Sequence, residues 1–271
     1  MTYHFPSCTA KNSLYIFGAS MAEWALMTRH SQVLRQILDK IQEFKTQGKS
    51  SLAVFDLDST LFDVSPRIQK VLQDFADNPQ FQERFPDSCA IVKTIKTMRN
   101  DWGIKNALIR AGLDGHHPDF HEAIREFWRQ SFFSNEYLEY DIPFEGAQSY
   151  VQALYETGCE IAYLTGRDVA RMGVGTTKVL KKWQFPLEDV QARVVLKPQK
   201  GMDDAQFKSD WFAALPANKY SGVWFFENEP VNVNLIRNTH AHVEIVFFDS
   251  THSGKSEAPS DLPRIVHFLL D

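Results

Sequence analysis

Two aspartates at the end of one apolar run are the residues best suited to chemistry. Residues 52–63 read Leu-Ala-Val-Phe-Asp-Leu-Asp-Ser-Thr-Leu-Phe-Asp, a pattern typical of a buried parallel strand that ends at the edge of a sheet. Side chains alternate along a strand, so Asp56 and Asp58 are expected to point the same way and to share one small volume. Such carboxylates repel each other unless a cation lies between them or one is protonated, and both outcomes serve catalysis.

Other polar residues occur where later strands of the same predicted sheet end. Ligands of parallel α/β sheets bind beyond the carboxyl ends of the strands, so these residues are expected to converge on one pocket with the aspartates. They are Thr60 after the first run, Thr165-Gly166-Arg167-Asp168 after the second, Glu227-Asn228-Glu229 after the fourth, and Lys208 near the start of the helix before that strand.

Together these motifs resemble the haloacid dehalogenase-like hydrolase superfamily, most of whose members are magnesium-dependent phosphatases. The resemblance covers about residues 50 to 250. The Asp-x-Asp-x-Thr motif matches Asp56 to Thr60, the second motif matches Thr165, the lysine matches Lys208 with Lys197 and Lys200 as alternatives, and the usual pair of aspartates corresponds to Glu227-Asn228.

The resemblance implies a two-step hydrolysis. Asp56 would attack phosphorus and form an aspartyl-phosphate. Asp58 would protonate the leaving oxygen and then take a proton from the attacking water. Thr165, Gly166 and Lys208 would bind the phosphate oxygens and stabilise their charge.

The resemblance also implies a Mg²⁺ ion. Its expected ligands are Asp56, the backbone carbonyl of Asp58, Glu227 and Asn228, together with waters and the phosphate. Without the ion, three carboxylates would form a trianionic cluster unable to accept a phosphate dianion. Glu227 and Asn228 depart from the usual aspartates, and a longer acid with one fewer charge is expected to change metal binding; whether Asn228 is a ligand stays open.

Charge and composition argue against several classes of partner. The net charge is −5 and there is no run of Lys and Arg, so neither nucleic acid nor a membrane surface is an expected partner. No signal peptide and no apolar stretch of membrane-spanning length is recognised. Cys8, Cys89 and Cys159 lie far apart, which indicates reduced, structural thiols in a cytoplasmic protein. The oligomeric state is left open.

The elements that must position these residues fall into three parts. Residues 1–30 show no periodicity and are expected to form an irregular arm that packs on the main domain. A core of residues 31–63 and 142–271 is predicted to surround a cap of residues 64–141, in which helices begin at Pro66 and lie near 91–98 and 120–128. Ser31 is the expected N-cap of a helix that Gly48 ends.

Strands and helices alternate after the cap. This alternation predicts a doubly wound parallel α/β sheet with an inserted all-helical cap. The strands are expected at 161–164, 192–196, 222–226 and 243–248, the helices at 147–154, 176–183, 203–215 and 231–237, and a short final helix after a loop at 250–260.

Several other patterns have simpler explanations. The Gly-x-Gly within 172–176 lacks a third glycine and does not follow a first strand, so a dinucleotide site is not expected. His116, His117 and His121 suggest a metal cluster, but a solvated helix start beside Pro118 is favoured.

Some side chains near the motifs have two possible roles. The aromatic residues Phe127, Trp128, Phe132 and Phe133 are interpreted as the core of the cap rather than a substrate platform. Arg167 either contacts substrate or forms a structural ion pair. Asp63 is expected to cap the turn after the first motif, or else to face the pocket.

The function hypothesis is a Mg²⁺-dependent phosphatase for a small phosphorylated metabolite. The cap is expected to close over the pocket and exclude water. Two alternatives stay open: a phosphotransferase or phosphomutase on the same scaffold, and a non-catalytic ligand-binding module.

Overall fold

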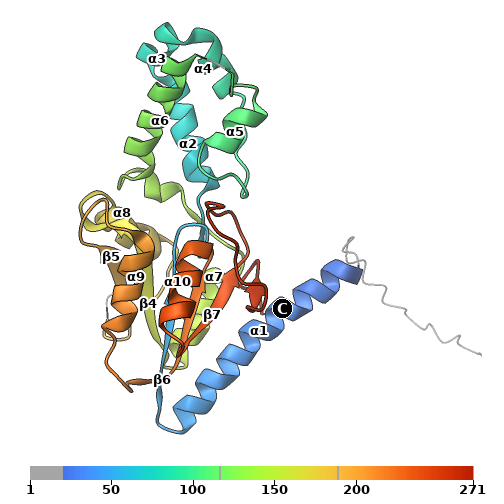
Figure 1. The fold of residues 1–271 in the computed structure, drawn as a ribbon, viewed down its shortest axis with the longest axis vertical. Coiled ribbons are helices and arrows are strands. Elements are labelled where there is room, and N and C mark those ends of the chain that lie inside the picture. The colour runs from blue at the N-terminus through green and yellow to red at the C-terminus, as the bar shows by residue number, and fades with distance from the viewer. Residues whose placement is uncertain (1–20, 116, 188, 271) are drawn as a thin grey trace, which may run out of the picture.

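The computed structural model describes residues 21–115, 117–187 and 189–270, with only the backbone described for 21–29 (Figure 1). Residues 1–20 of the expected arm therefore lie outside the described residues, and residues 21–30 are helical rather than irregular. They begin α1 (Met21–Thr46), which Gly48 follows with a positive φ of 67°. Ser31 is buried inside this helix and its hydroxyl donates to the Leu269 carbonyl, so it is not the N-cap.

The core is built on a six-stranded parallel sheet, which confirms the predicted fold class. The strand order is β5-β4-β1-β6-β7-β8, and every neighbouring pair is parallel. In chain order the strands are β1 (Ser50–Phe55), β4 (Glu160–Asp168), β5 (Ala192–Lys197), β6 (Tyr220–Glu227), β7 (Val243–Phe248) and β8 (Arg264–Ile265).

Helices cover both faces of the sheet. Alternation along β1 sends Ala53 and Phe55 into an apolar cluster with α1, α7 (Ala147–Glu156) and α8 (Val169–Lys182). Leu52 and Val54 point into a second cluster with α9 (Asp204–Ala213) and α10 (Pro230–Thr239). Because the strands are parallel, their carboxyl ends all lie at one edge of the sheet, and this edge faces the cap (Figure 1).

The structure corrects three expected elements of the core. β4 continues four residues past the predicted 161–164, with a register irregularity between Leu164 and Asp168. α8 begins at Val169 rather than 176, because Asp168 caps it by accepting from the Arg171 amide. The short final helix is absent from the described residues: after the 250–260 loop the chain adds β8 to the sheet edge instead.

The cap is joined to the core by a short antiparallel ribbon, β2 (Phe62–Asp63) with β3 (Ile142–Pro143). Between them lie α2 (Ser65–Asp77), α3 (Pro79–Arg84), α4 (Pro86–Val92), α5 (Lys105–Arg110), α6 (Pro118–Phe132) and the 3-10 helix η1 (Tyr137–Tyr140). The helix predicted near 91–98 ends at Val92, and Ile95 and Met98 follow in non-helical chain. The described part of the cap has no strand inside this ribbon and has an apolar core of its own.

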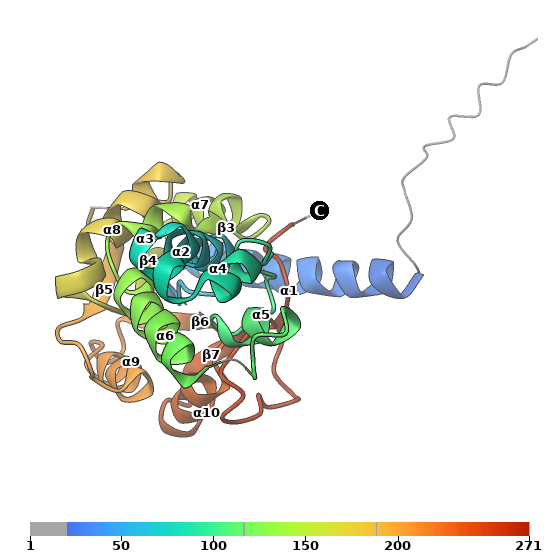
Figure 2. The ribbon, with the colours of Figure 1, turned by 90° about the horizontal axis from the view of Figure 1, so that it is seen from above.

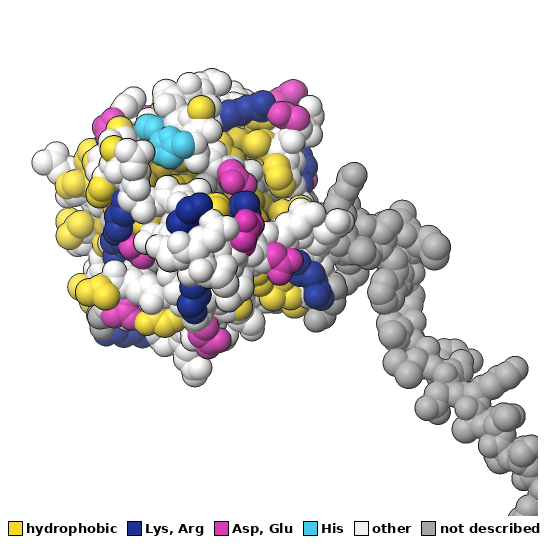
Figure 3. Space-filling view, turned by 90° about the horizontal axis from the view of Figure 1, so that it is seen from below, with side chains coloured by type: hydrophobic (Ala, Val, Ile, Leu, Met, Phe, Trp, Pro, Cys, Tyr) yellow, Lys and Arg dark blue, Asp and Glu magenta, His cyan; other side chains and the backbone are white. Residues whose placement is uncertain are grey.

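Two further views describe the exterior. From above, the cap helices lie over the middle of the sheet edge while α1 extends away from the body (Figure 2). On the face opposite the cap, Lys and Arg side chains are mixed with acidic and apolar ones (Figure 3). In the part of the chain that the structure describes, no helix combines the length and apolarity needed to cross a membrane.

The two described thiols are both buried, with Cys89 1% and Cys159 0% exposed, and burial raises the pKa of Cys159 to about 12. In a Cys8→Ser background we expect neither thiol to react with Ellman's reagent at pH 8, because reaction requires an accessible thiolate. The same protein in guanidinium chloride should react at both thiols. Rapid labelling of the native variant would contradict this packing.

Candidate functional site

The first motif occupies a turn, not the end of a strand. β1 ends at Phe55, and the amides of Thr60, Leu61 and Phe62 all donate to the Leu57 carbonyl. Ser59 completes the turn in the left-handed region, with φ 62°. The expectation that Asp56 and Asp58 point the same way was based on the alternation of side chains along a strand. That basis is wrong, because the strand ends before both residues. The two carboxylates border one cavity but are held by different cations.

Asp56 is buried between a lysine and a hydroxyl. Its Oδ1 accepts from Lys208 Nζ at 2.6 Å, and its Oδ2 lies 3.2 Å from Thr60 Oγ1. Burial, with the negative charge of Glu227, raises the pKa of Asp56 to about 7 although Lys208 opposes the shift. The same two acids raise the pKa of Lys208, so its ammonium stays charged.

Glu227 binds the other side of that lysine. Its Oε2 accepts from Lys208 Nζ at 2.6 Å and from Asn232 Nδ2 at 3.0 Å, and its Oε1 accepts from the amides of Asn228 and Glu229 at 3.0 and 2.9 Å. A carboxylate offers about four lone-pair sites. All of those on Glu227 are therefore occupied within the protein.

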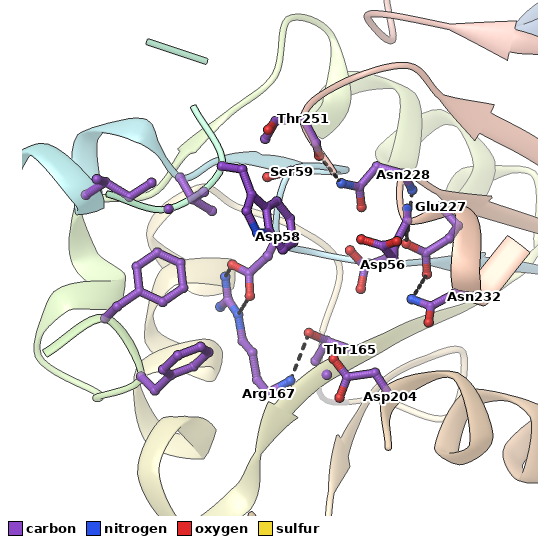
Figure 4. Close-up of a pocket in the computed structure, with 18 of the residues that line it drawn as sticks. Asp56, Asp58, Ser59, Thr165, Arg167, Asp204, Glu227, Asn228, Asn232 and Thr251 are labelled. Carbon is purple, nitrogen blue, oxygen red and sulfur yellow. Dashed lines mark hydrogen bonds and ion pairs between the residues drawn. The ribbon is translucent and has the colours of Figure 1, made fainter. Parts of the chain in front are cut away.

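Asn228 faces Asp56 across Thr60. Its Oδ1 lies 3.0 Å from Thr60 Oγ1, and its Nδ2 donates to the Thr251 carbonyl at 2.6 Å. The bond to Thr251 fixes which amide atom points inward, so the oxygen is directed to the side of the proposed nucleophile (Figure 4).

Asp58 belongs to a separate ion-pair cluster, in which the two arginines are fully buried. Arg167 donates to it from Nη2 at 2.7 Å and from Nε at 3.2 Å (Figure 4). Arg67 Nη2 donates to the same carboxylate. Both guanidiniums also bind Asp141, at 2.6 to 2.7 Å. The arginines hold the pKa of Asp58 well below its usual range, although burial opposes them. Arg167, for which substrate contact was one possibility, is thus engaged in an ion-pair cluster.

This arrangement corrects the expected trianionic cluster. Asp58 is compensated by the arginines, while Lys208 lies between Asp56 and Glu227. When Asp56 is ionised, the two carboxylates and one ammonium leave a single negative charge at this position. That charge still opposes a phosphate dianion, but far less than three free carboxylates would.

The remaining residues of the motifs border the same cavity. Thr165 is buried, and its Oγ1 accepts from the Arg167 amide at 3.3 Å. A Cβ on Gly166 would lie 2.5 Å from Asp204 Oδ2, so the Asp204 side chain would have to move to admit one. Both residues line the cavity, as do Asp56, Lys208 and the residues Asn228 and Glu229 that follow β6.

Of the three lysines considered, Lys208 is the one in contact with Asp56. Lys197 binds Asp204 and the Met202 carbonyl, and Lys200 is exposed. The side chain of Lys208 reaches the site because α9 places it on the face packed against the sheet, where it is 1% exposed.

The discounted patterns have structural explanations. The Gly-x-Gly lies inside α8, where a Cβ on Gly175 would be 2.5 Å from the Asn135 carbonyl oxygen, so this glycine permits close packing. His117 begins α6, and His116 lies outside the described residues. Among the described residues there is no group of three or more His, Cys, Asp or Glu side chains able to hold a metal.

The four aromatic residues near the end of α6 have two different roles. Phe127 packs on Phe75 and Phe81 in the cap core. Trp128, Phe132 and Phe133 pack on one another but also line the cavity, so the interpretation as core alone is incomplete.

Asp63 accepts hydrogen bonds from the Ser65 amide at 2.8 Å and from Arg99 Nε at 3.0 Å. It therefore caps the start of α2, and it is absent from the cavity lining.

Two charged residues of the site were missed from the sequence. Arg67 and Asp141 are both 0% exposed and complete the cluster around Asp58. One signal was available: Arg67 falls in the otherwise apolar face of α2 that buries Ile68 and Val71. A charged residue on such a face requires a buried partner.

The donor set fits a hard divalent cation in part. Asp56 Oδ2 and Asn228 Oδ1 share Thr60 as their neighbour, and both are oxygen atoms of the kind Mg²⁺ prefers as ligands. Glu227 does not fit the role of a direct ligand, because its oxygens already accept four hydrogen bonds.

Comparison with known proteins gives only distant likeness. No family model and no curated protein matches the chain. A protein from Clostridium difficile is 14% identical, covering 73% of this chain and 85% of its own, with a TM-score of 0.47. A haloacid dehalogenase-like family hydrolase from Streptococcus pneumoniae is 10% identical, covering 73% and 84%, with a TM-score of 0.43.

A HAD-superfamily hydrolase of subfamily IA from Geobacter sulfurreducens is 15% identical, covering 81% of this chain and 93% of its own, with a TM-score of 0.43. Two of the three proteins bear the name of the superfamily that the sequence motifs resemble. At similarities this low, the basis for a function is the geometry of the site itself.

The cluster around Asp58 predicts an unequal response to two arginine substitutions at the junction of cap and core. Arg67→Met should lower the free energy of unfolding by about 3–5 kcal/mol, because it leaves the fully buried carboxylate of Asp141 short of a partner. Arg99→Met is the matched control: its side chain is 52% exposed in pairs with Asp63 and Glu145, so a loss of about 0–1 kcal/mol is expected. Urea unfolding measures both, and equal losses would be incompatible with the cluster as described.

Proposed function

We propose that the chain is a phosphate monoester hydrolase in which Asp56 is the nucleophile. The observation that carries this proposal is the position of Asp56: a buried carboxylate beyond β1, oriented by Lys208 and Thr60 at the floor of a cavity that Thr165 and Gly166 also line. An oriented nucleophile with cationic and hydroxyl groups around it suits transfer of a phosphoryl group.

In the first step Asp56 attacks phosphorus, its bond to phosphorus forms, and the bond from phosphorus to the ester oxygen breaks. Lys208 orients the carboxylate and stabilises charge on the phosphoryl oxygens, while Thr165 and Gly166 bind those oxygens. In the second step water attacks phosphorus and releases Asp56 with inorganic phosphate.

Asp58 is the proposed proton carrier. Arg67 and Arg167 keep it ionised, which is the form that accepts the proton of the attacking water, although the same ion pairs make it a weak base. As the acid of the first step it must gain a proton against both arginines. Leaving groups that depart without a full proton should therefore depend less on Asp58.

Mg²⁺ is the proposed cofactor. When bound, the ion would neutralise the charge that phosphate brings to a site already carrying one uncompensated negative charge. Asp56, the Asp58 carbonyl and Asn228 are the residues that would hold it, and Glu227 would serve instead as the counter-ion that fixes Lys208.

The first test is hydrolysis of 4-nitrophenyl phosphate and a set of phosphorylated metabolites with Mg²⁺. Wild-type protein should release phosphate, while Asp56→Asn should lose activity by at least about a thousandfold, because an amide does not replace the nucleophile. Circular dichroism controls for folding. Activity retained by Asp56→Asn would remove Asp56 from the mechanism.

Product analysis separates the alternatives. Transfer of phosphate to an added alcohol in preference to water would indicate a phosphotransferase. A folded wild-type protein that binds phosphate esters but hydrolyses none with Mg²⁺, Mn²⁺ or Co²⁺ would indicate a ligand-binding module.

The metal assignment predicts a specific effect of Asn228→Ala. Loss of Oδ1 should weaken Mn²⁺ binding, measured by electron paramagnetic resonance, by ~10–100-fold, the range found when metal-site partners are removed. Asn234→Ala is the matched control, since Asn234 binds the Glu257 carbonyl and is absent from the cavity lining. Unchanged Mn²⁺ affinity in Asn228→Ala would rule out the amide as a ligand.

A further inference from the structure

The wall of the cavity that the cap supplies differs chemically from its floor. The cavity has a volume of about 280 Å³, and its floor carries Asp56, Thr165, Lys208 and Glu227. The wall from the cap is mainly apolar and aromatic: Val64, Ile68, Trp102, Trp128, Phe132 and Phe133. Small-molecule sites usually measure ~300–1,000 Å³, so the space suits a compact substrate.

This wall offers no free cation for a second anionic group. Asp101 is the only charged side chain that the described part of the cap contributes to it. That carboxylate is 2% exposed and already accepts from Arg110 and from the Met98 amide. A second phosphate or a carboxylate placed against this wall would find no cation there, and a polyol would find few hydrogen-bond partners.

Trp128 is a fixed part of this wall. Its ring borders the cavity and is held in place by its neighbours: the ring centroids of Phe132 and Phe133 lie 5.2 and 5.6 Å away, and a Cβ on Gly103 would lie 3.4 Å from its Cζ2. The face of a fixed aromatic ring is a surface on which a second ring can stack.

We infer that the substrate is the phosphate monoester of a compact, otherwise uncharged aromatic alcohol, whose ring packs on Trp102, Trp128 and Phe133. This inference rests on the proposed phosphatase function and names its substrate class. The net reaction is ester plus water to aromatic alcohol plus inorganic phosphate, with no further reactant.

The experiment compares esters whose leaving groups are all primary alcohols, so that intrinsic reactivity is similar. Wild-type protein with Mg²⁺ should hydrolyse benzyl phosphate with a kcat/KM at least roughly tenfold above those of glycerol phosphate and glucose 6-phosphate, because only the benzyl ring fills the apolar wall. Cyclohexylmethyl phosphate, which is similarly apolar but lacks an aromatic face, should be hydrolysed with a lower kcat/KM than benzyl phosphate.

Trp128→Leu keeps an apolar side chain but removes the aromatic face. This variant should reduce the kcat/KM ratio of benzyl phosphate over glycerol phosphate by roughly three- to tenfold, the contribution of one aromatic pair. Trp211→Leu, on α9 and outside the cavity lining, is the matched control and should leave the ratio unchanged. Thermal unfolding followed by circular dichroism checks that both variants fold.

The outcomes separate the inference from the function on which it rests. Preference for glycerol phosphate or glucose 6-phosphate, or an unchanged ratio in Trp128→Leu, would overturn the aromatic substrate class while hydrolysis itself supports the phosphatase. Folded wild-type protein that hydrolyses none of these esters, nor 4-nitrophenyl phosphate, would overturn the proposed function.

Discussion

Compensation of buried charge is the constraint on which the arrangement of cap and core depends. Arg67 comes from the first cap helix, Asp141 from the return to the core, Arg167 from β4, and Asp58 from the turn after β1. Removing any one of these charges leaves an opposite charge in a medium where it is poorly solvated. The four segments therefore hold one another in place, and the position of the cap over the cavity follows from that requirement.

A second compensated group lies beside the first and has a different composition. Lys208 is shared by Asp56 and Glu227, and Glu227 is fixed by two backbone amides and Asn232. Glu227 is thus immobilised, and Lys208, which it holds, orients Asp56. The site separates the two acids of the first motif into two electrostatic environments, one that raises the pKa of Asp56 and one that lowers that of Asp58.

Local pattern was enough to predict the sheet, because each strand of a doubly wound fold is an apolar run bounded by turns and helices. The strands at 192–196, 222–226 and 243–248 differ from the observed ones by at most two residues at an end. The start of α8 was missed because Gly173 and Gly175 weaken the helical pattern, whereas in the structure Gly175 allows the approach of Asn135.

The charge pairing could not be predicted in the same way. Asp58 and Arg167 are 109 positions apart, and Arg67 and Asp141 are 74 apart, so no periodicity connects them. The trianionic cluster was a wrong inference for the same reason: the acids stand in recognisable motifs, but the cations that neutralise them do not. The sequence likewise does not show which oxygens of Glu227 and Asn228 are free to bind a metal. That depends on hydrogen bonds with backbone amides and with Thr251, which come near only in the folded chain.

The ribbon of β2 and β3 has a consequence for how such a chain diversifies. Because the cap leaves and rejoins the core through two adjacent strands, the insert can be exchanged without altering the order of the sheet. The interchangeable unit is nevertheless smaller than the cap. A transplanted insert has to retain an arginine one turn into its first helix and an aspartate just before its exit, so the portion free to vary runs from about residue 68 to about residue 140. Within that portion lies most of the aromatic wall, whereas the groups proposed to handle phosphate lie outside it.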